Sequence, residues 1–99
     1  MSVLMIRAKV KPESVEHVEA SAGKMFAAIE QAQPQGVRYA SCKQPDGVTF
    51  VVLLELEDGT DNPLSALPEF REFQDNLRSW VAEPPVPEPL TVVGSYRLF

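Results

Sequence analysis

Residues 48–56 are expected to form a strand with apolar side chains on both of its faces. Side chains in a strand alternate between two faces. One face would carry Val48, Phe50, Val52, Leu54 and Leu56. The other face would carry Thr49, Val51, Leu53 and Glu55. A strand with one face in water shows polar residues on that face. This segment therefore predicts a central strand that is covered on both sides.

The chain is short, so it can supply only part of that cover. Its 99 residues form one domain, residues 1–99. Two helices can cover one face of a four-stranded sheet, which leaves the second face exposed. The simplest cover for that face is a second copy of the chain, so we expect a homodimer with its sheets packed face to face.

Composition and charge narrow the classes of partner. The chain is 44% hydrophobic and 23% charged, which is typical of a globular protein. A net charge of -5 without any basic run argues against nucleic-acid and anionic-membrane partners, which need a basic patch. No apolar run approaches the length of about 20 residues that a membrane helix needs. Cys42 is the single cysteine, so an internal disulfide is impossible and a reduced, cytoplasmic setting is expected.

The first half of the sequence predicts a strand, a helix and a hairpin. Residues 3–10 alternate as a strand, and Pro12 suits the first turn of a helix of about 18 residues. Gln33-Pro34-Gln35-Gly36 ends that helix. Residues 37–44 form a second strand, and Pro45-Asp46-Gly47 is a strong hairpin turn before the strand at 48–56.

The second half predicts another helix and a last strand. The helix begins near Pro68, and its apolar residues at helical spacing are Phe70, Phe73, Leu77, Trp80 and Val81. Residues 83–89 contain four prolines and are interpreted as an extended connector, because proline lacks the backbone donor of a central strand. Residues 90–99 alternate and are expected to form the last strand. The order β-α-β-β-α-β is the α+β, ferredoxin-like plan, in which the first and third strands are central.

Four stretches carry a resemblance to a known family. They cover the first strand, the start of the second strand, the hairpin with the third strand, and the start of the second helix. The stretches are Met5-Ile6-Arg7-Ala8-Lys9-Val10-Lys11-Pro12-Glu13, Gly36-Val37-Arg38-Tyr39, Pro45-Asp46-Gly47 with Phe50-Val51-Val52-Leu53-Leu54-Glu55, and Leu67-Pro68-Glu69-Phe70-Arg71-Glu72-Phe73. In order and length they resemble the antibiotic biosynthesis monooxygenase family, the dimeric α+β barrel group.

The resemblance implies a fold, a partner and an activity. Members have the plan described above and pair sheet to sheet into a barrel. Known members include cofactor-independent oxygenases of phenolic polyketides and quinols, and heme-degrading relatives. By this resemblance the chain would be an oxidoreductase, a cofactor-independent monooxygenase of a small aromatic or quinone-type compound that uses no metal. The same fold also serves other functions. The alternative is therefore a non-catalytic dimeric module that binds a small molecule or has a structural role.

The chain departs from the family pattern at three places. Glu57 stands where a tryptophan commonly follows the third-strand glutamate, and the start of the second helix lacks the usual histidines. Ile6-Arg7 occupies the region where heme-degrading members have an asparagine. These departures disfavour heme degradation and favour the non-catalytic alternative.

Two groups of residues are candidates for a site. Phe70, Phe73 and Trp80 would give a pocket between helices and sheet an aromatic lining. Tyr39, Arg38 and Tyr96 are the candidates for catalysis, because a tyrosine hydroxyl can orient a phenolic substrate and an arginine can stabilise a phenolate. For each of these residues a structural role stays open.

The remaining polar residues favour structural interpretations. The strand arginines Arg7, Arg38 and Arg97 are expected to pair with a carboxylate such as Glu55. His17 is the only histidine and is expected to lie in solvent, without the further ligands that a metal site needs. Cys42 is expected to be an inert thiol, because no triad pattern surrounds it.

Overall fold

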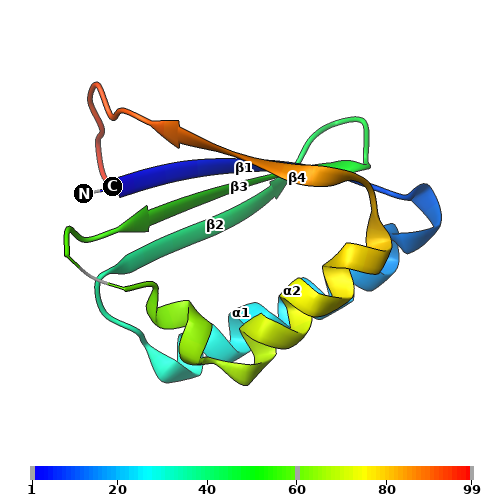
Figure 1. The fold of residues 1–99 in the computed structure, drawn as a ribbon, viewed down its shortest axis with the longest axis horizontal. Helices are drawn as coiled ribbons and strands as arrows, with labels where there is room; N and C mark the ends of the chain where they lie inside the picture. Colours follow the sequence, from blue (N-terminus) through cyan, green and yellow to red (C-terminus); the bar gives the residue numbers. More distant parts are fainter. Residues whose placement is uncertain (1, 60, 99) are drawn as a thin grey trace.

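A four-stranded antiparallel sheet lies against two helices in the computed structural model, which describes residues 2–59 and 61–98. The strands follow the order β2-β3-β1-β4 (Figure 1). Their bounds are Ser2–Val10 for β1, Val37–Lys43 for β2, Thr49–Leu56 for β3 and Val81–Leu90 for β4. The helices are α1, Val15–Ala32, and α2, Pro68–Trp80. The ferredoxin-like prediction, with the first and third strands in the centre, is confirmed.

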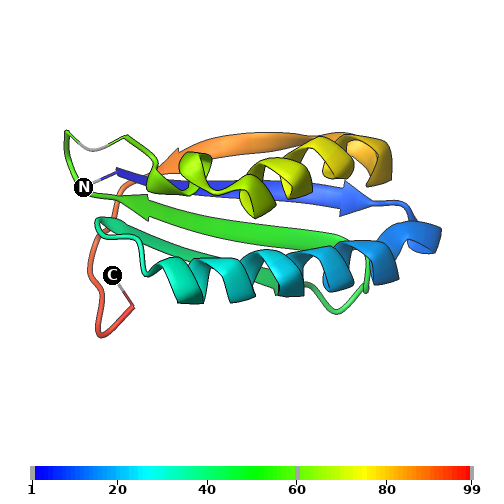
Figure 2. The same ribbon diagram turned by 90° about the horizontal axis from the view of Figure 1, so that it is seen from below.

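Both helices lie on the same face of the sheet, side by side (Figure 2). Pro12 opens a short 3₁₀ turn before α1, and Gln33 ends α1 in a left-handed conformation with φ of 48°. Pro68 occupies the first turn of α2, where its missing N–H costs no hydrogen bond. The predicted start of α2 is therefore confirmed, whereas α1 begins at Val15, after the 3₁₀ turn that Pro12 opens.

Asp46 holds the hairpin between β2 and β3. Its carboxylate accepts hydrogen bonds from the Thr49 hydroxyl at 2.6 Å and from the backbone N–H groups of Val48 and Thr49 at 2.9 Å each. The hydroxyl first, and then the two N–H groups, lower the pKa of the Asp46 carboxyl. Gly47 has a φ of 78°, a region that glycine enters without strain. The predicted turn at residues 45–47 is confirmed.

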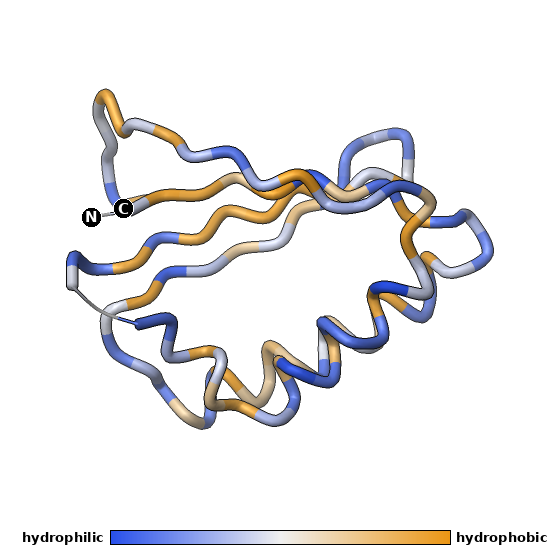
Figure 3. The backbone as a smooth tube through the Cα atoms, in the orientation of Figure 1, coloured by the Kyte–Doolittle hydropathy of each residue, from blue (hydrophilic) through white to orange (hydrophobic). Residues whose placement is uncertain are grey.

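The core lies between the helices and the sheet. Its buried cluster takes residues from both layers: Val10, Val18, Met25, Phe50 and Phe73. β3 pairs with β1 on one side and with β2 on the other, as its sequence predicted. Hydrophobic residues run along both central strands (Figure 3). Since Phe50 faces the helices, alternation places Val51, Leu53 and Glu55 on the opposite, open face.

The last strand differs from the prediction. β4 covers Val81–Leu90, so the proline-rich segment is an edge strand, and residues 91–98 lie outside any strand. Pro87 stands opposite Ile6 and Pro89 opposite Leu4. Proline is tolerated on an edge strand where its missing N–H would point away from the neighbouring strand. Pro87 and Pro89 are two residues apart, so both missing donors fall on that outer side. The hydrogen bonds between β4 and β1 are therefore kept.

The segment 91–98 crosses the end of the sheet on the side away from the helices (Figures 1 and 2). The Arg38 guanidinium donates a hydrogen bond to the Leu98 carbonyl at 3.4 Å. Val3, on the open face of β1, is only 4% exposed. The open face is therefore covered at one end by the chain's own C-terminal segment. In the parts of the chain that the structure describes, no helix combines the length and apolar character needed to cross a bilayer.

Candidate functional site

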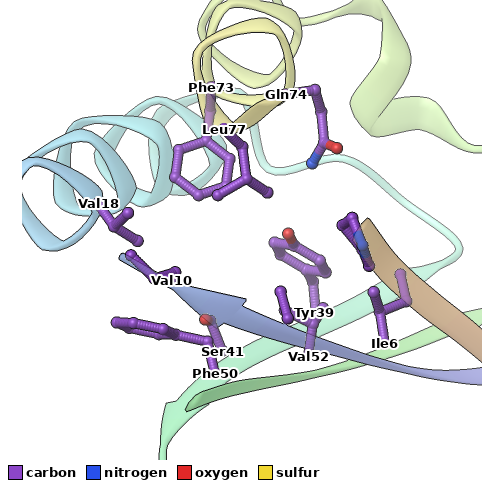
Figure 4. A pocket seen from close by; sticks show the side chains of 12 residues that line it. Ile6, Val10, Val18, Tyr39, Ser41, Phe50, Val52, Phe73, Gln74 and Leu77 are labelled. Carbon is purple, nitrogen blue, oxygen red and sulfur yellow. The ribbon is translucent and has the colours of Figure 1, made fainter. Parts of the chain in front are cut away.

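A cavity of about 70 Å³ lies between the sheet and the helices (Figure 4). All four strands and both helices contribute to its wall. The lining residues are Ile6, Ala8, Val10, Val18, Tyr39, Ser41, Phe50, Val52, Phe73, Gln74, Leu77 and Pro85. Most of them are apolar, so the few polar groups in this wall decide what chemistry the cavity can perform.

Tyr39 places its hydroxyl at this cavity. Its ring stacks on Phe26 with centroids 5.3 Å apart and meets Phe70 edge-on at 6.1 Å. Figure 4 shows the hydroxyl directed from the sheet toward α2. Burial raises the pKa of Tyr39 to about 12, because the phenolate would lose its hydration. The hydroxyl is therefore neutral at physiological pH and can donate a hydrogen bond, but it cannot serve as a base.

Two further polar side chains line the cavity, Ser41 from β2 and Gln74 from α2. Neither of them titrates near neutral pH. None of the described lining residues is Asp, Glu, His, Lys or Arg. This wall can therefore orient and polarise a ligand oxygen, but it offers no general base.

A second hollow lies outside the cavity, between α2 and β4. Its volume is about 180 Å³, and its wall includes Gln74, Leu77 and Pro85, which also line the inner cavity. Arg78 and Val81 complete the outer hollow. The three shared residues form the boundary between the two spaces.

The structure separates the three predicted pocket aromatics. Phe73 lines the cavity, while Phe70 lies behind the wall against Tyr39. Trp80 does not line the cavity, and its ring stacks on His17 with centroids 6.0 Å apart and an interplanar angle of 15°. The expectation that these residues contact a ligand stays a prediction.

The catalytic candidates do not come together within the chain. Arg38 and Tyr39 are neighbours on β2, so their side chains point to opposite faces of the sheet. Tyr96 is 83% exposed in the C-terminal segment, with the Arg97 guanidinium 5.1 Å from its ring centroid. Only Tyr39 of the three lines the cavity.

Gln74 was not among the site residues predicted from the sequence. Its signal lay in the spacing, because Gln74 follows Phe73 and stands three residues before Leu77, at the border of the apolar stripe of α2. A lone amide at such a border is common on helices, so spacing alone does not mark it as a site residue.

The expected pairs with Glu55 are not found among the described residues. Arg38 binds the Leu98 carbonyl instead, and the Oε2 atom of Glu55 is buried without a described hydrogen-bond partner. On β2, the Lys43 ammonium pairs with Glu19 at 2.5 Å. Within residues 2–59 and 61–98, no three His, Cys, Asp or Glu side chains gather as a metal site would require.

Comparisons with solved structures identify the fold. The chain aligns with a protein from Nitrosomonas europaea, provisionally described as an antibiotic biosynthesis monooxygenase, at a TM-score of 0.76 and 16% identity, over 93% of this chain and 89% of the other. A provisionally described monooxygenase from Caulobacter crescentus aligns at 0.74 and 20% identity, over 94% and 90%. A variant of SnoaB, a cofactor-independent oxygenase from Streptomyces nogalater, aligns at 0.70 and 15% identity, over 97% and 96%.

These likenesses confirm the resemblance to antibiotic biosynthesis monooxygenases at the level of the fold. No protein-family model matches the sequence. No curated protein matches it either. At such low sequence identity, the activity has to be argued from the site of this chain.

Proposed function

We propose that this protein is a cofactor-independent monooxygenase that acts on a small aromatic or quinone-type compound. The observation that carries the proposal is the Tyr39 hydroxyl, which is held neutral at an aromatic-flanked, largely apolar cavity. A buried neutral donor stabilises a developing oxyanion more strongly than the same donor in water. The fold that the chain shares with SnoaB supports the choice of oxygen chemistry.

The substrate itself supplies the electrons in this reaction. An anthrone-type or quinol-type compound loses a proton to give an enolate or phenolate. This anion reduces O₂, one oxygen atom enters the ring as a carbonyl, and the other leaves as water. The conversion of a CH₂ group and O₂ into C=O and H₂O balances without an external reductant. Tyr39 donates a hydrogen bond to the substrate oxygen that carries the delocalised charge.

The absence of a base among the described lining residues restricts the substrate. The proton has to leave before the compound enters the cavity, or pass to water at its mouth. Compounds whose ionisation is difficult in neutral solution are therefore poor substrates. Phenols, quinols and anthrones fit this requirement when electron-withdrawing substituents make them acidic.

The proposed enzyme is a homodimer through the open face of the sheet. Val51 and Leu53 lie on that face, and both are only partly buried within one chain. The described large apolar side chains with the greatest exposure also belong to β4 and the segment that follows it: Val86, Leu90, Val93, Tyr96 and Leu98. A second copy would cover the side chains of β3 on this face and the aliphatic side chains among these residues by an isologous contact.

The size of the cavity favours the alternative function, a non-catalytic module that binds a small molecule or has a structural role. An apolar cavity of about 150 Å³ holds a benzene ring. The inner cavity, at about 70 Å³, is smaller, so a ring would also have to occupy the outer hollow. Catalysis on an aromatic compound therefore requires the boundary at Gln74, Leu77 and Pro85 to move.

Ligand binding and oxygen consumption distinguish the two functions. Anthrones, quinols and hydroxylated naphthoquinones are screened by thermal shift, and an oxygen electrode then follows turnover of each compound that binds. We expect Tyr39→Phe to lower kcat/KM about a hundredfold to a thousandfold, the loss typical of an oxyanion donor. Tyr96→Phe removes the same atom from an exposed tyrosine and is expected to leave the rate unchanged. Binding without oxygen consumption for every compound would favour the non-catalytic module.

A further inference from the structure

We propose that the Tyr39 hydroxyl and the Gln74 carboxamide form a two-donor site for one ligand oxygen, so that the cavity selects the phenolate or enolate form of an aromatic ligand. This inference rests on the proposed function. It adds Gln74 to the site and specifies that the bound ligand is the anion. Gln74 is the specificity-determining residue in this pair.

The two side chains reach the cavity from opposite walls. Tyr39 projects from β2, and Gln74 projects from α2, one residue after the buried Phe73. Figure 4 shows the hydroxyl and the carboxamide directed into the same space. A ligand oxygen placed between them could accept a hydrogen bond from the Tyr39 O–H and another from the Gln74 Nε2–H.

Both donors are available to a ligand. Among the described residues, no hydrogen bond involves the Tyr39 hydroxyl or the Gln74 side chain. Tyr39 is partly buried, so its hydroxyl gains more from such a partner than the amide of Gln74, which is exposed. The amide lies at the boundary with the outer hollow, where the body of a ring could extend.

The charges of the wall determine which ligand form is favoured. Tyr39 is protonated and Gln74 is uncharged, so both can donate without giving up a proton. Hydrogen bonds from neutral donors to an oxyanion are about twice as strong as those to a neutral oxygen. No carboxylate in the described lining would repel the anion. Two convergent donors therefore offset the loss of hydration that an apolar cavity imposes on a phenolate.

The test uses 4-nitrophenol as a probe, because its phenol and phenolate forms absorb differently. Absorbance titrations of the whole protein give the affinity for each form and the apparent pKa of the bound probe. We expect the anion to bind more tightly than the phenol, which places the bound pKa below that of the free probe. Gln74→Leu and Tyr39→Phe should each weaken anion binding about tenfold and raise the bound pKa. Nitrobenzene, which lacks the ionisable oxygen, should bind all variants within about twofold.

Two further variants separate a specific role from a structural one. Gln74→Glu keeps the size of the side chain but places a negative charge beside the oxygen, so it should raise the bound pKa further than Gln74→Leu. Gln31→Leu makes the same change at an exposed position of α1, away from the cavity, and should alter neither quantity. An unchanged bound pKa in Gln74→Leu would overturn the inference, as would a wild-type protein that binds no 4-nitrophenol.

Oxygen consumption separates this inference from the monooxygenase proposal. If 4-nitrophenol shows the expected dependence on Gln74 but no anthrone or quinol consumes oxygen, the two-donor site stands and the monooxygenase fails. If a substrate is oxidised and Gln74→Leu changes neither its KM nor the bound pKa of 4-nitrophenol, the monooxygenase stands and the two-donor site fails.

Discussion

At the residue scale, the burial of Tyr39 links the candidate site to stability at high pH. The folded protein holds the pKa of this hydroxyl at about 12, against an ordinary value of 10.0 for the free side chain. Below pH 10 both states carry the proton, so the contribution to the free energy of unfolding is constant. Between pH 10 and about 12 only the folded state keeps the Tyr39 proton. The free energy of unfolding therefore falls by up to about 1.4 kcal/mol for each pH unit.

Tyr39→Phe should remove most of this alkaline loss. Phenylalanine keeps the contacts with Phe26 and Phe70 but has no proton to lose. We expect the urea midpoint of the variant to decline less than that of the wild type between pH 10 and 12. Tyr96→Phe is the control, because Tyr96 is exposed and its substitution should leave the wild-type decline unchanged. Parallel declines in the wild type and Tyr39→Phe would contradict the assignment.

Tyr39 also shows what a sequence can indicate about a site. Its residue type and its place on an edge strand made it a candidate, and the structure puts it at the cavity. Arg38 had an equal claim by residue type, yet the alternation of a strand sends it to the other face. Which face of β2 meets the helices depends on packing across the whole sheet. The sequence of β2 is too polar to settle that choice.

At the element scale, β4 is the one strand whose position was predicted wrongly from the sequence. Four prolines between residues 83 and 89 suggested a connector, because proline cannot donate to a ladder. Pairing with β1 alone leaves one side of β4 without a neighbour, and prolines spaced by two can be accommodated there. The alternation of residues 90–99 suggested a strand, but alternation requires a neighbour to pair with. The edge of the sheet was already occupied by β4.

The proline spacing in β4 makes a position-specific prediction. Because Pro87 and Pro89 cannot donate, the N–H of Glu88 between them is expected to point toward β1, opposite Met5. Glu88→Pro should remove that donor and leave a strand carbonyl unpaired. We expect a loss of about 1–3 kcal/mol in the free energy of unfolding, measured by urea denaturation.

Pro89→Ala is the matched control, since it restores an N–H on the outer side, where no strand pairs. It should change the free energy of unfolding by less than about 0.5 kcal/mol, as is usual for surface substitutions. The reverse order of the two effects would mean that the outer side of β4 carries the ladder bonds.

At the scale of the whole molecule, the two helices cover one face of the sheet, the inner face, and no helix of the described residues covers the other, open face. The helices cover the inner face and leave a small cavity there (Figure 2). On the open face, the segment 91–98 covers one end and leaves Val93 fully exposed. A globular chain gains stability when such apolar groups leave water, which is the physical basis for the proposed homodimer.

Leu53 provides the sharpest test of that dimer. It lies on the open face of the central strand β3, opposite Met5 on β1 and Ala40 on β2. We expect the wild type to sediment with twice the 11.0 kDa mass of one chain. Leu53→Glu should weaken association at least tenfold, because two like charges would meet near the two-fold axis in a dry interface. Circular dichroism would establish that the variant chain is folded.

Ala27→Glu adds the same charge to an exposed position of α1 and should leave the dimer intact, since the helices lie on the other face of the sheet. A wild-type protein with the mass of one chain at every concentration would rule out the dimer, and so would a Leu53→Glu variant that associates as tightly as Ala27→Glu. In either case, the partly buried Val51 and Leu53 side chains would leave water only by contact with a different partner.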